Sequence, residues 1–198
     1  MRRTRRDWLA LGETLLRDEG EQALTLERLC HEMHLTRGSF YHHFQGTEAY
    51  RQALLRDWQE RLTEEVILEL PAERGGTDLL ARLGQRVARL DHRLDLAFRA
   101  WSLRDESVRA VMEAVDARRI ALLTELHAHL GHGRPEDLAR LDYASFVGMQ
   151  ALGWLPQDLL LQRLQSRATG LLAQELITSG GEGAAASPHT LPDGPLPR

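Results

Sequence analysis

The sequence of 198 residues contains no lysine and no asparagine, so all 25 of its basic residues are arginine. The absence of lysine excludes a Schiff-base mechanism and the lysine of a nucleotide-binding P-loop. The absence of asparagine excludes every catalytic scheme that needs that side chain. The single cysteine, Cys30, rules out an internal disulfide framework and a metal site built from several thiolates.

Long apolar runs are also missing. No stretch approaches the roughly 18 to 20 apolar residues that a membrane-spanning helix needs. Residues 1–8 pass directly into a charged helical pattern and do not resemble the start of a signal peptide. The formal net charge of −4 is typical neither of a polybasic nucleic-acid coat nor of a membrane-surface protein. We therefore expect a cytoplasmic protein with no membrane partner.

Apolar residues recur at helical spacing along most of the chain, and no segment shows the sustained alternation of a β-strand. The sequence therefore predicts an all-α fold. Glycine and proline separate the expected helices. These helices lie near residues 4–19, 25–33, 36–43, 47–69, 77–90, 93–103, 105–130, 135–154 and 157–178.

Three parts are expected along the chain: three short helices in residues 1–46, a helical bundle in residues 47–178 and a tail in residues 179–198. The tail holds four of the seven prolines, a composition typical of disorder. Residues 181–186 match the dinucleotide-binding glycine fingerprint formally, but no strand precedes them, so we discard the match.

Residues 25–44 have the length and spacing of a helix-turn-helix. Thr25 and Thr36 stand where helical periodicity begins, and their hydroxyls suit the N-cap position. The inward faces are apolar: Leu26, Leu29 and Met33 on one helix, and Leu35, Phe40 and Phe44 on the next. An αα-corner without a ligand would explain these apolar residues equally well.

The outer side of the second helix of this motif carries Arg37, Ser39, Tyr41, His42 and His43. Arginine can bind guanine O6 and N7 with two hydrogen bonds, and hydroxyls can bind any base edge or phosphate. Gly38 lets the helix backbone approach a duplex closely. Packing alone does not explain this face, which predicts DNA binding.

The run of residues 35–44 followed by Gly46, Thr47 and Glu48, with Gly20, Thr25 and Leu29 before it, resembles the DNA-binding domain of the TetR family of transcriptional regulators. Within it, Tyr41-x-His43-Phe44 is the most specific part. The resemblance implies a homodimer that represses transcription from an inverted-repeat operator in double-stranded DNA and releases it when a small effector enters the C-terminal bundle. It implies no enzymatic activity and no cofactor. The expected DNA contacts are Thr25, Thr36, Arg37, Gly38, Ser39, Tyr41, His42, His43 and Thr47.

The motif departs from the family pattern at two positions. His34 replaces the usual glycine of the turn and has to adopt a left-handed conformation. Thr47 replaces the lysine after the recognition helix. Residues 1–46 also contain seven arginines and seven acidic residues, so we expect few ionic contacts and a weak salt dependence. Four of these arginines are expected to form an arm along the phosphates: Arg2, Arg3, Arg5 and Arg6.

The bundle is expected to hold a small, largely apolar effector. Ligand pockets combine apolar walls with a few converging polar groups. Candidate lining residues are Phe98, Trp101, Met112, Arg119, Tyr143, Val147 and Gln150, and His92 and Arg99 are further polar candidates. The apolar residues of this set can equally be core.

Small and apolar residues recur in the last two expected helices, where they permit close helix approach between two copies of the chain. The candidate dimer residues are Leu141, Ser145, Gly148, Leu152, Leu164, Ala168 and Leu171. Packing within one chain is the alternative.

Two histidine groups resemble metal motifs, but no metal site is expected. Cys30, near His31 and His34, should point inward. His127, His129 and His132 are interpreted as a surface cluster favoured by the helix dipole. No hydrolase, zincin or Walker motif is present. The alternative function is an all-α enzyme or small-molecule-binding protein whose first three helices only pack.

Overall fold

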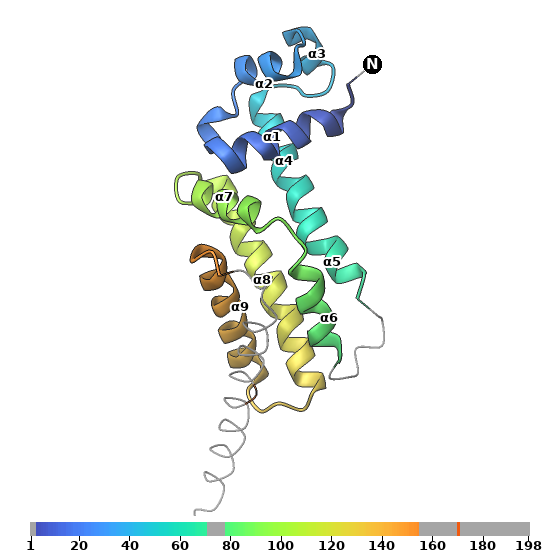
Figure 1. Ribbon diagram of the computed structural model, residues 1–198, viewed down its shortest axis with the longest axis vertical. Helices are drawn as coiled ribbons and strands as arrows, with labels where there is room; N and C mark the ends of the chain where they lie inside the picture. Colours follow the sequence, from blue (N-terminus) through green and yellow to red (C-terminus); the bar gives the residue numbers. More distant parts are fainter. Residues whose placement is uncertain (1–2, 71–77, 155–169, 171–198) are drawn as a thin grey trace, which may run out of the picture.

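The computed structural model describes residues 3–70 and 78–154, together with Gly170 (Figure 1). Within these residues the chain is helical and contains no strand, so the all-α prediction is confirmed. The elements are α1 (Arg5–Glu19), the 3₁₀ turn η1 (Glu21–Ala23), α2 (Leu26–Met33), α3 (Arg37–Tyr41), α4 (Thr47–Gln59), the π-helical turn η2 (Glu60–Glu64), α5 (Glu65–Leu68), α6 (Asp78–Val87), α7 (His92–Ser102), α8 (Glu106–His129) and α9 (Pro135–Ala151).

Helix α1 begins with a capping box. The Asp7 amide donates to Thr4 Oγ1 (3.3 Å), and the Thr4 amide donates to Asp7 Oδ2 (2.7 Å). Arg5 and Arg6 are therefore the first residues of α1, as the expected helix near 4–19 predicts, so the four arginines do not form one arm separate from the helix. The Arg5 guanidinium lies over the Phe44 ring, 5.2 Å from its centroid.

The first three helices and the start of α4 pack around aromatic rings. Phe40 is fully buried and meets the Trp8 ring edge to face at 5.4 Å. The Tyr50 hydroxyl donates to the Trp8 carbonyl (2.7 Å), which fixes α4 against α1. Gly12 is required at this crossing, because a Cβ there would lie 1.9 Å from the Tyr50 hydroxyl. We call this unit, residues 3–46, the head.

The apolar core continues from the head into the bundle. The Trp58 ring of α4 lies 4.7 Å from the Phe98 ring of α7, tilted by 35°, and both side chains are fully buried. Trp101 and Met112 belong to the same cluster as Trp8 and Phe40 of the head. Rotation of the head relative to α7 would therefore expose apolar surface, which opposes such movement.

A single helical path leaves the head and enters the bundle, as the expected helix at 47–69 predicts (Figure 1). It runs through α4, η2 and α5, and the π-helical turn interrupts its regular hydrogen bonding at residues 60–64. In the bundle, α8 packs against both α7 and α9.

The expected helix at 157–178 and the expected tail lie outside the described residues, apart from Gly170. The candidate dimer residues Leu164, Ala168 and Leu171 lie outside them as well. Among the described residues, none of the helices combines the length and the hydropathy required to cross a bilayer.

Candidate functional site

The helix-turn-helix is capped as the sequence predicts. Thr25 Oγ1 accepts a hydrogen bond from the Arg28 amide (3.2 Å), and Thr36 Oγ1 accepts one from the Ser39 amide (3.4 Å). Between the two helices, His34 adopts the left-handed conformation with φ 55° and ψ 42°. This conformation lets α2 end and α3 leave at a sharp angle.

The outer face of α3 and of the turn after it is accessible, and we call it the reading face: Arg37, Gly38, Ser39, Tyr41, His42 and His43. His42 and His43 lie in that turn, because α3 ends at Tyr41, two residues before the expected end. Arg37, Gly38, Tyr41 and His42 are exposed, whereas Ser39 and His43 are half-buried. A Cβ on Gly38 would meet only Thr36 Oγ1, at 3.7 Å, so the backbone of α3 is open to a close neighbour. Thr47, at the start of α4, is half-buried.

Arginines of the head are paired with acidic side chains. Arg37 Nη2 lies 2.7 Å from Glu27 Oε1, and Arg28 contacts both Glu19 (2.8 Å) and Glu32 (3.0 Å). Glu27 was not predicted from the sequence as a neighbour of the reading face. Its only signal was the zero net charge of residues 1–46, which implies that positive charges have acidic partners.

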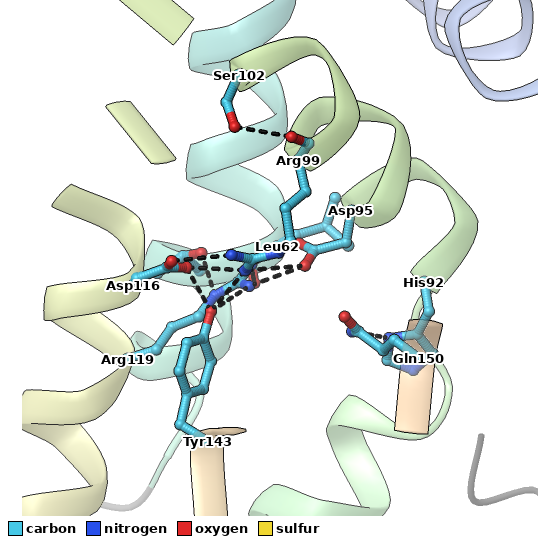
Figure 2. Close-up of polar contacts among 10 residues, drawn as sticks. Leu62, His92, Asp95, Arg99, Ser102, Asp116, Arg119, Tyr143 and Gln150 are labelled. Atoms are coloured by element: carbon cyan, nitrogen blue, oxygen red, sulfur yellow. Dashed lines mark hydrogen bonds and ion pairs between the residues drawn. The ribbon is translucent and has the colours of Figure 1, made fainter. Parts of the chain in front are cut away.

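The bundle contains a partly buried network of two arginines and two aspartates (Figure 2). Arg99 of α7 donates to both carboxylate oxygens of Asp116 on α8 (2.9 and 2.8 Å). Arg119 of α8 donates to both oxygens of Asp95 on α7 (3.3 and 3.0 Å). Tyr143 of α9 donates to Asp116 Oδ1 (2.6 Å) and accepts from Arg99 (3.1 Å). The four formal charges cancel, which lowers the cost of taking them partly out of water.

The same network reaches the helical path that carries the head. Arg119 Nε donates to Thr63 Oγ1 (3.1 Å), and its Nη2 donates to the Leu62 carbonyl (3.4 Å). Both acceptors lie in the π-helical turn. Such a turn leaves backbone carbonyls without their regular helical partners, so Leu62 can accept from a side chain. Arg119 therefore joins α8 to the segment between α4 and α5.

Hydrogen bonding fixes the protonation states in this network. Burial raises the pKa of Asp116, but hydrogen bonds from Arg99 and Tyr143 outweigh it, and the net pKa is lowered. Burial, together with the nearby Asp116, raises the pKa of Tyr143 to about 12. At neutral pH the network therefore contains an ionised Asp116 and a protonated Tyr143.

The structure divides the candidate pocket residues into two groups. Phe98, Trp101 and Met112 lie in the apolar core shared with the head. Arg119 and Tyr143 lie in the charged network, and Gln150 contacts His92 (3.0 Å) next to it. Val147 of α9 is half-buried. Asp95, Asp116 and Thr63 were not predicted as members of the network. A single acidic or hydroxyl residue in an amphipathic helix is normally expected to face solvent.

The interpretation of His127 as part of a surface cluster is wrong. Its side chain is fully buried, with Nδ1 2.9 Å from His132 Nδ1 and Nε2 3.0 Å from Asp142 Oδ2. His129 is exposed and bonds to the Glu125 carbonyl. Hydrogen bonds to both ring nitrogens offset the desolvation of the imidazole, which explains how it tolerates burial. In residues 3–70 and 78–154, no three His, Cys, Asp or Glu side chains are grouped so that they could hold a metal ion.

Apolar side chains remain exposed along α9 and just after it. Leu141 is 42% exposed, Leu152 60% and Trp154 59%. Ser145 is exposed beside them and Gly148 is half-buried. The sequence analysis did not single out Trp154. We call Leu141, Ser145, Gly148, Leu152 and Trp154 the α9 stripe.

No protein-family model matches the chain, and no curated protein sequence matches it. Solved structures do match. Reduced NemR from E. coli is 22% identical with a TM-score of 0.66, over 86% of this chain and 96% of that one. A putative regulator of the TetR/AcrR family is 23% identical with a TM-score of 0.69, over 83% and 96%. GusR from Salmonella enterica is 23% identical with a TM-score of 0.65, over 85% and 94%. The chain therefore shares its all-α fold with these structures, among them a protein described as a TetR/AcrR-family regulator, and this agrees with the fold that the resemblance of its helix-turn-helix predicts.

Proposed function

We propose that this protein is a DNA-binding transcriptional regulator of the TetR type, without enzymatic activity. It acts as a homodimer on an inverted-repeat operator and represses transcription until a small effector binds in the bundle. The observation that carries the proposal is the accessible reading face on a capped helix α3. The shared fold with a TetR/AcrR-family regulator supports it.

In the proposed complex, α3 enters the major groove. Arg37 and Ser39 contact base edges, while residues around them contact the phosphate backbone. The backbone contacts are Thr25, Thr36, Tyr41, His43 and Thr47. Without asparagine, adenine can be bound bidentately only by glutamine, and Gln45 is the one near the reading face. Contacted positions are therefore expected to favour guanine, through Arg37.

A second copy of the chain is proposed to cover the α9 stripe. Large apolar side chains exposed along a helix and just after it are typical of an interface. Two copies related by a two-fold axis present two reading faces, which fit successive major grooves roughly 34 Å apart.

The effector is proposed to act through Arg119. This side chain bonds to α7, to α9 and to the π-helical turn that leads back to the head. An effector that binds more tightly when this network is rearranged shifts the population toward that state. Because α4 continues into the turn, the rearrangement changes the separation of the two heads.

An electrophoretic mobility shift with the purified protein and the DNA upstream of its own gene tests the proposal. A shift that resists an excess of unrelated DNA of equal length supports it. No shift, with the protein folded and at micromolar concentration, overturns it in favour of the alternative, an enzyme or carrier whose first helices only pack.

A further inference from the structure

His92 and Gln150 form a buried polar pair between the start of α7 and the end of α9. Their side chains are 7% and 2% exposed, and Gln150 Nε2 lies 3.0 Å from His92 Nδ1. The other polar atom of each side chain, His92 Nε2 and Gln150 Oε1, makes no hydrogen bond within the described part of the chain. Buried polar atoms nearly always have partners. Two such atoms on paired side chains therefore indicate a binding position.

The hydrogen bond between the two side chains defines what the pair offers. An amide nitrogen can only donate, so His92 Nδ1 accepts and the proton of the neutral ring resides on Nε2. Burial lowers the pKa of His92 despite the opposing effects of Asp95 and of the Val87 carbonyl, which lies near the ring but outside hydrogen-bond geometry with Nε2, so the ring stays neutral. The pair thus presents one donor, Nε2–H, and one acceptor, Oε1. Rotating the amide by 180° exchanges the two roles but leaves one donor and one acceptor.

The charges nearby argue against a charged ligand. Figure 2 shows the pair beside the Arg–Asp network but not bonded to it. Each guanidinium of that network already has a carboxylate partner: Arg99 binds Asp116 and Arg119 binds Asp95. An anion would have to separate one of these partly buried ion pairs, and a cation would find no carboxylate of this network without an arginine on it.

An aromatic surface adjoins the pair. The Phe146 ring lies 5.4 Å from the His92 ring in an edge-on arrangement and 6.4 Å from the Tyr143 ring. Phe146 is only half-buried, so part of its side chain remains accessible for an aromatic contact. A ligand held by His92 and Gln150 would therefore have an apolar or aromatic body next to its polar group.

We propose that the His92–Gln150 pair recognises the effector and selects an uncharged group that carries a donor and an acceptor on neighbouring atoms, such as a carboxamide or lactam on an aromatic body. This inference rests on the proposed function as an effector-controlled regulator and narrows the class of effector from largely apolar to apolar with a neutral amide-like group. The pair is a binding site for that group and takes no part in a reaction.

Four probes that share one ring and differ in one group test this selection: benzamide, benzoate, benzylamine and toluene. Calorimetric titration of the full-length protein should show benzamide binding at least tenfold more tightly than the other three. Gln150→Leu should reduce the affinity for benzamide about tenfold, because it removes one hydrogen bond between the protein and the ligand. The same change at an exposed position, Gln52→Leu, should leave it unchanged. Equal binding of benzoate or toluene, no binding of benzamide to the wild type, or full binding to a folded Gln150→Leu overturns the proposal.

A second measurement needs no variant. With ¹⁵N-histidine labelling, the Nε2 resonance of His92 should shift when benzamide is added and stay unchanged with toluene. An unchanged resonance at saturating benzamide contradicts the proposal even if Gln150→Leu does not fold. The mobility shift on upstream DNA is run on the same preparation. If the protein binds benzamide but not the upstream DNA, the proposed function as a DNA-binding regulator is refuted and the ligand class is not. If it binds the DNA but not benzamide, only the proposed class of effector is refuted.

Discussion

Arg37 and Glu27 form an ion pair between α3 and α2, with Nη2 2.7 Å from Oε1, although their side chains are 65% and 67% exposed. Exposed ion pairs contribute only about 0.2 to 1 kcal/mol, because water screens them. Glu27 therefore orients Arg37 in the free protein and competes weakly with DNA for it.

Removing the charge of Glu27 should strengthen DNA binding. In Glu27→Gln, Arg37 no longer has to leave a carboxylate, and we expect the affinity for upstream DNA to rise about two- to fivefold. Glu32→Gln is the matched control, since it removes an equal charge from the same helix but leaves Arg37 paired. Fluorescence anisotropy measures both. If Glu27→Gln binds the upstream DNA more weakly than Glu32→Gln does, the prediction is wrong, and the ion pair with Glu27 holds Arg37 in the orientation that DNA binding requires.

The bundle should depend on the pairing of Arg119 with Asp95. The Asp95 side chain is only 4% exposed, so Arg119→Met leaves a carboxylate that is nearly free of water and has lost its main partner. We expect the free energy of unfolding to fall by about 3 to 5 kcal/mol, as for other broken buried pairs. The double variant Arg119→Met/Asp95→Leu should recover most of this loss. Urea denaturation measures both, and a double variant no more stable than the single one would contradict the prediction.

Stability should fall in mild acid because His92 is buried as a neutral ring. Burial places its folded-state pKa below the ordinary value of 6.5, so unfolding takes up a proton below that pH. The contribution of His92 to the free energy of unfolding is therefore complete above pH 6.5 and is lost as the pH falls. For one proton, this loss is at most about 1.4 kcal/mol per pH unit. His92→Phe should flatten this dependence in urea titrations at several pH values, whereas His129→Phe, at an exposed position, should not. We expect His132 to account for the pH dependence that remains in His92→Phe, because burial and the nearby His127 lower the pKa of His132 as well.

The α9 stripe should hold the dimer together. Leu152→Glu places a charge on a side chain that is 60% exposed in one copy and covered in the proposed dimer. We expect sedimentation velocity to show monomers and the affinity for DNA to fall. Leu103→Glu, at a position 82% exposed in the α7–α8 turn, is the control and should remain dimeric. If the Leu152→Glu protein stays dimeric, the dimer interface does not lie on the α9 stripe and the prediction is wrong.

Local signals in the sequence predicted the head well. The N-caps Thr25 and Thr36 and the left-handed His34 were all identified, because capping and turn geometry depend on the residue itself and its nearest neighbours. The capping box at Thr4 has the same local origin, and it fixes the start of α1 within one residue of the expected helix near 4–19.

The contacts that the sequence did not predict join residues far apart in the chain. Asp95 meets Arg119, and Thr63 meets the same guanidinium, only after α7, α8 and the π-helical turn have packed. His127 looked exposed because one sequence does not show that Asp142 and His132 would satisfy its ring. Periodicity identifies an inward face but not which polar residues on it will find partners.

The central claim is that the reading face of α3 binds DNA and discriminates among bases. The most direct test measures the affinity of wild type, Arg37→Ala and Arg93→Ala for the upstream site and for its single-base variants. Arg93 is a suitable control because its side chain is 70% exposed and lies on α7. We predict that Arg37→Ala costs about 1 to 3 kcal/mol and loses discrimination at one position of each half-site, while Arg93→Ala matches the wild type. Wild-type affinity and base preference in Arg37→Ala would contradict the claim.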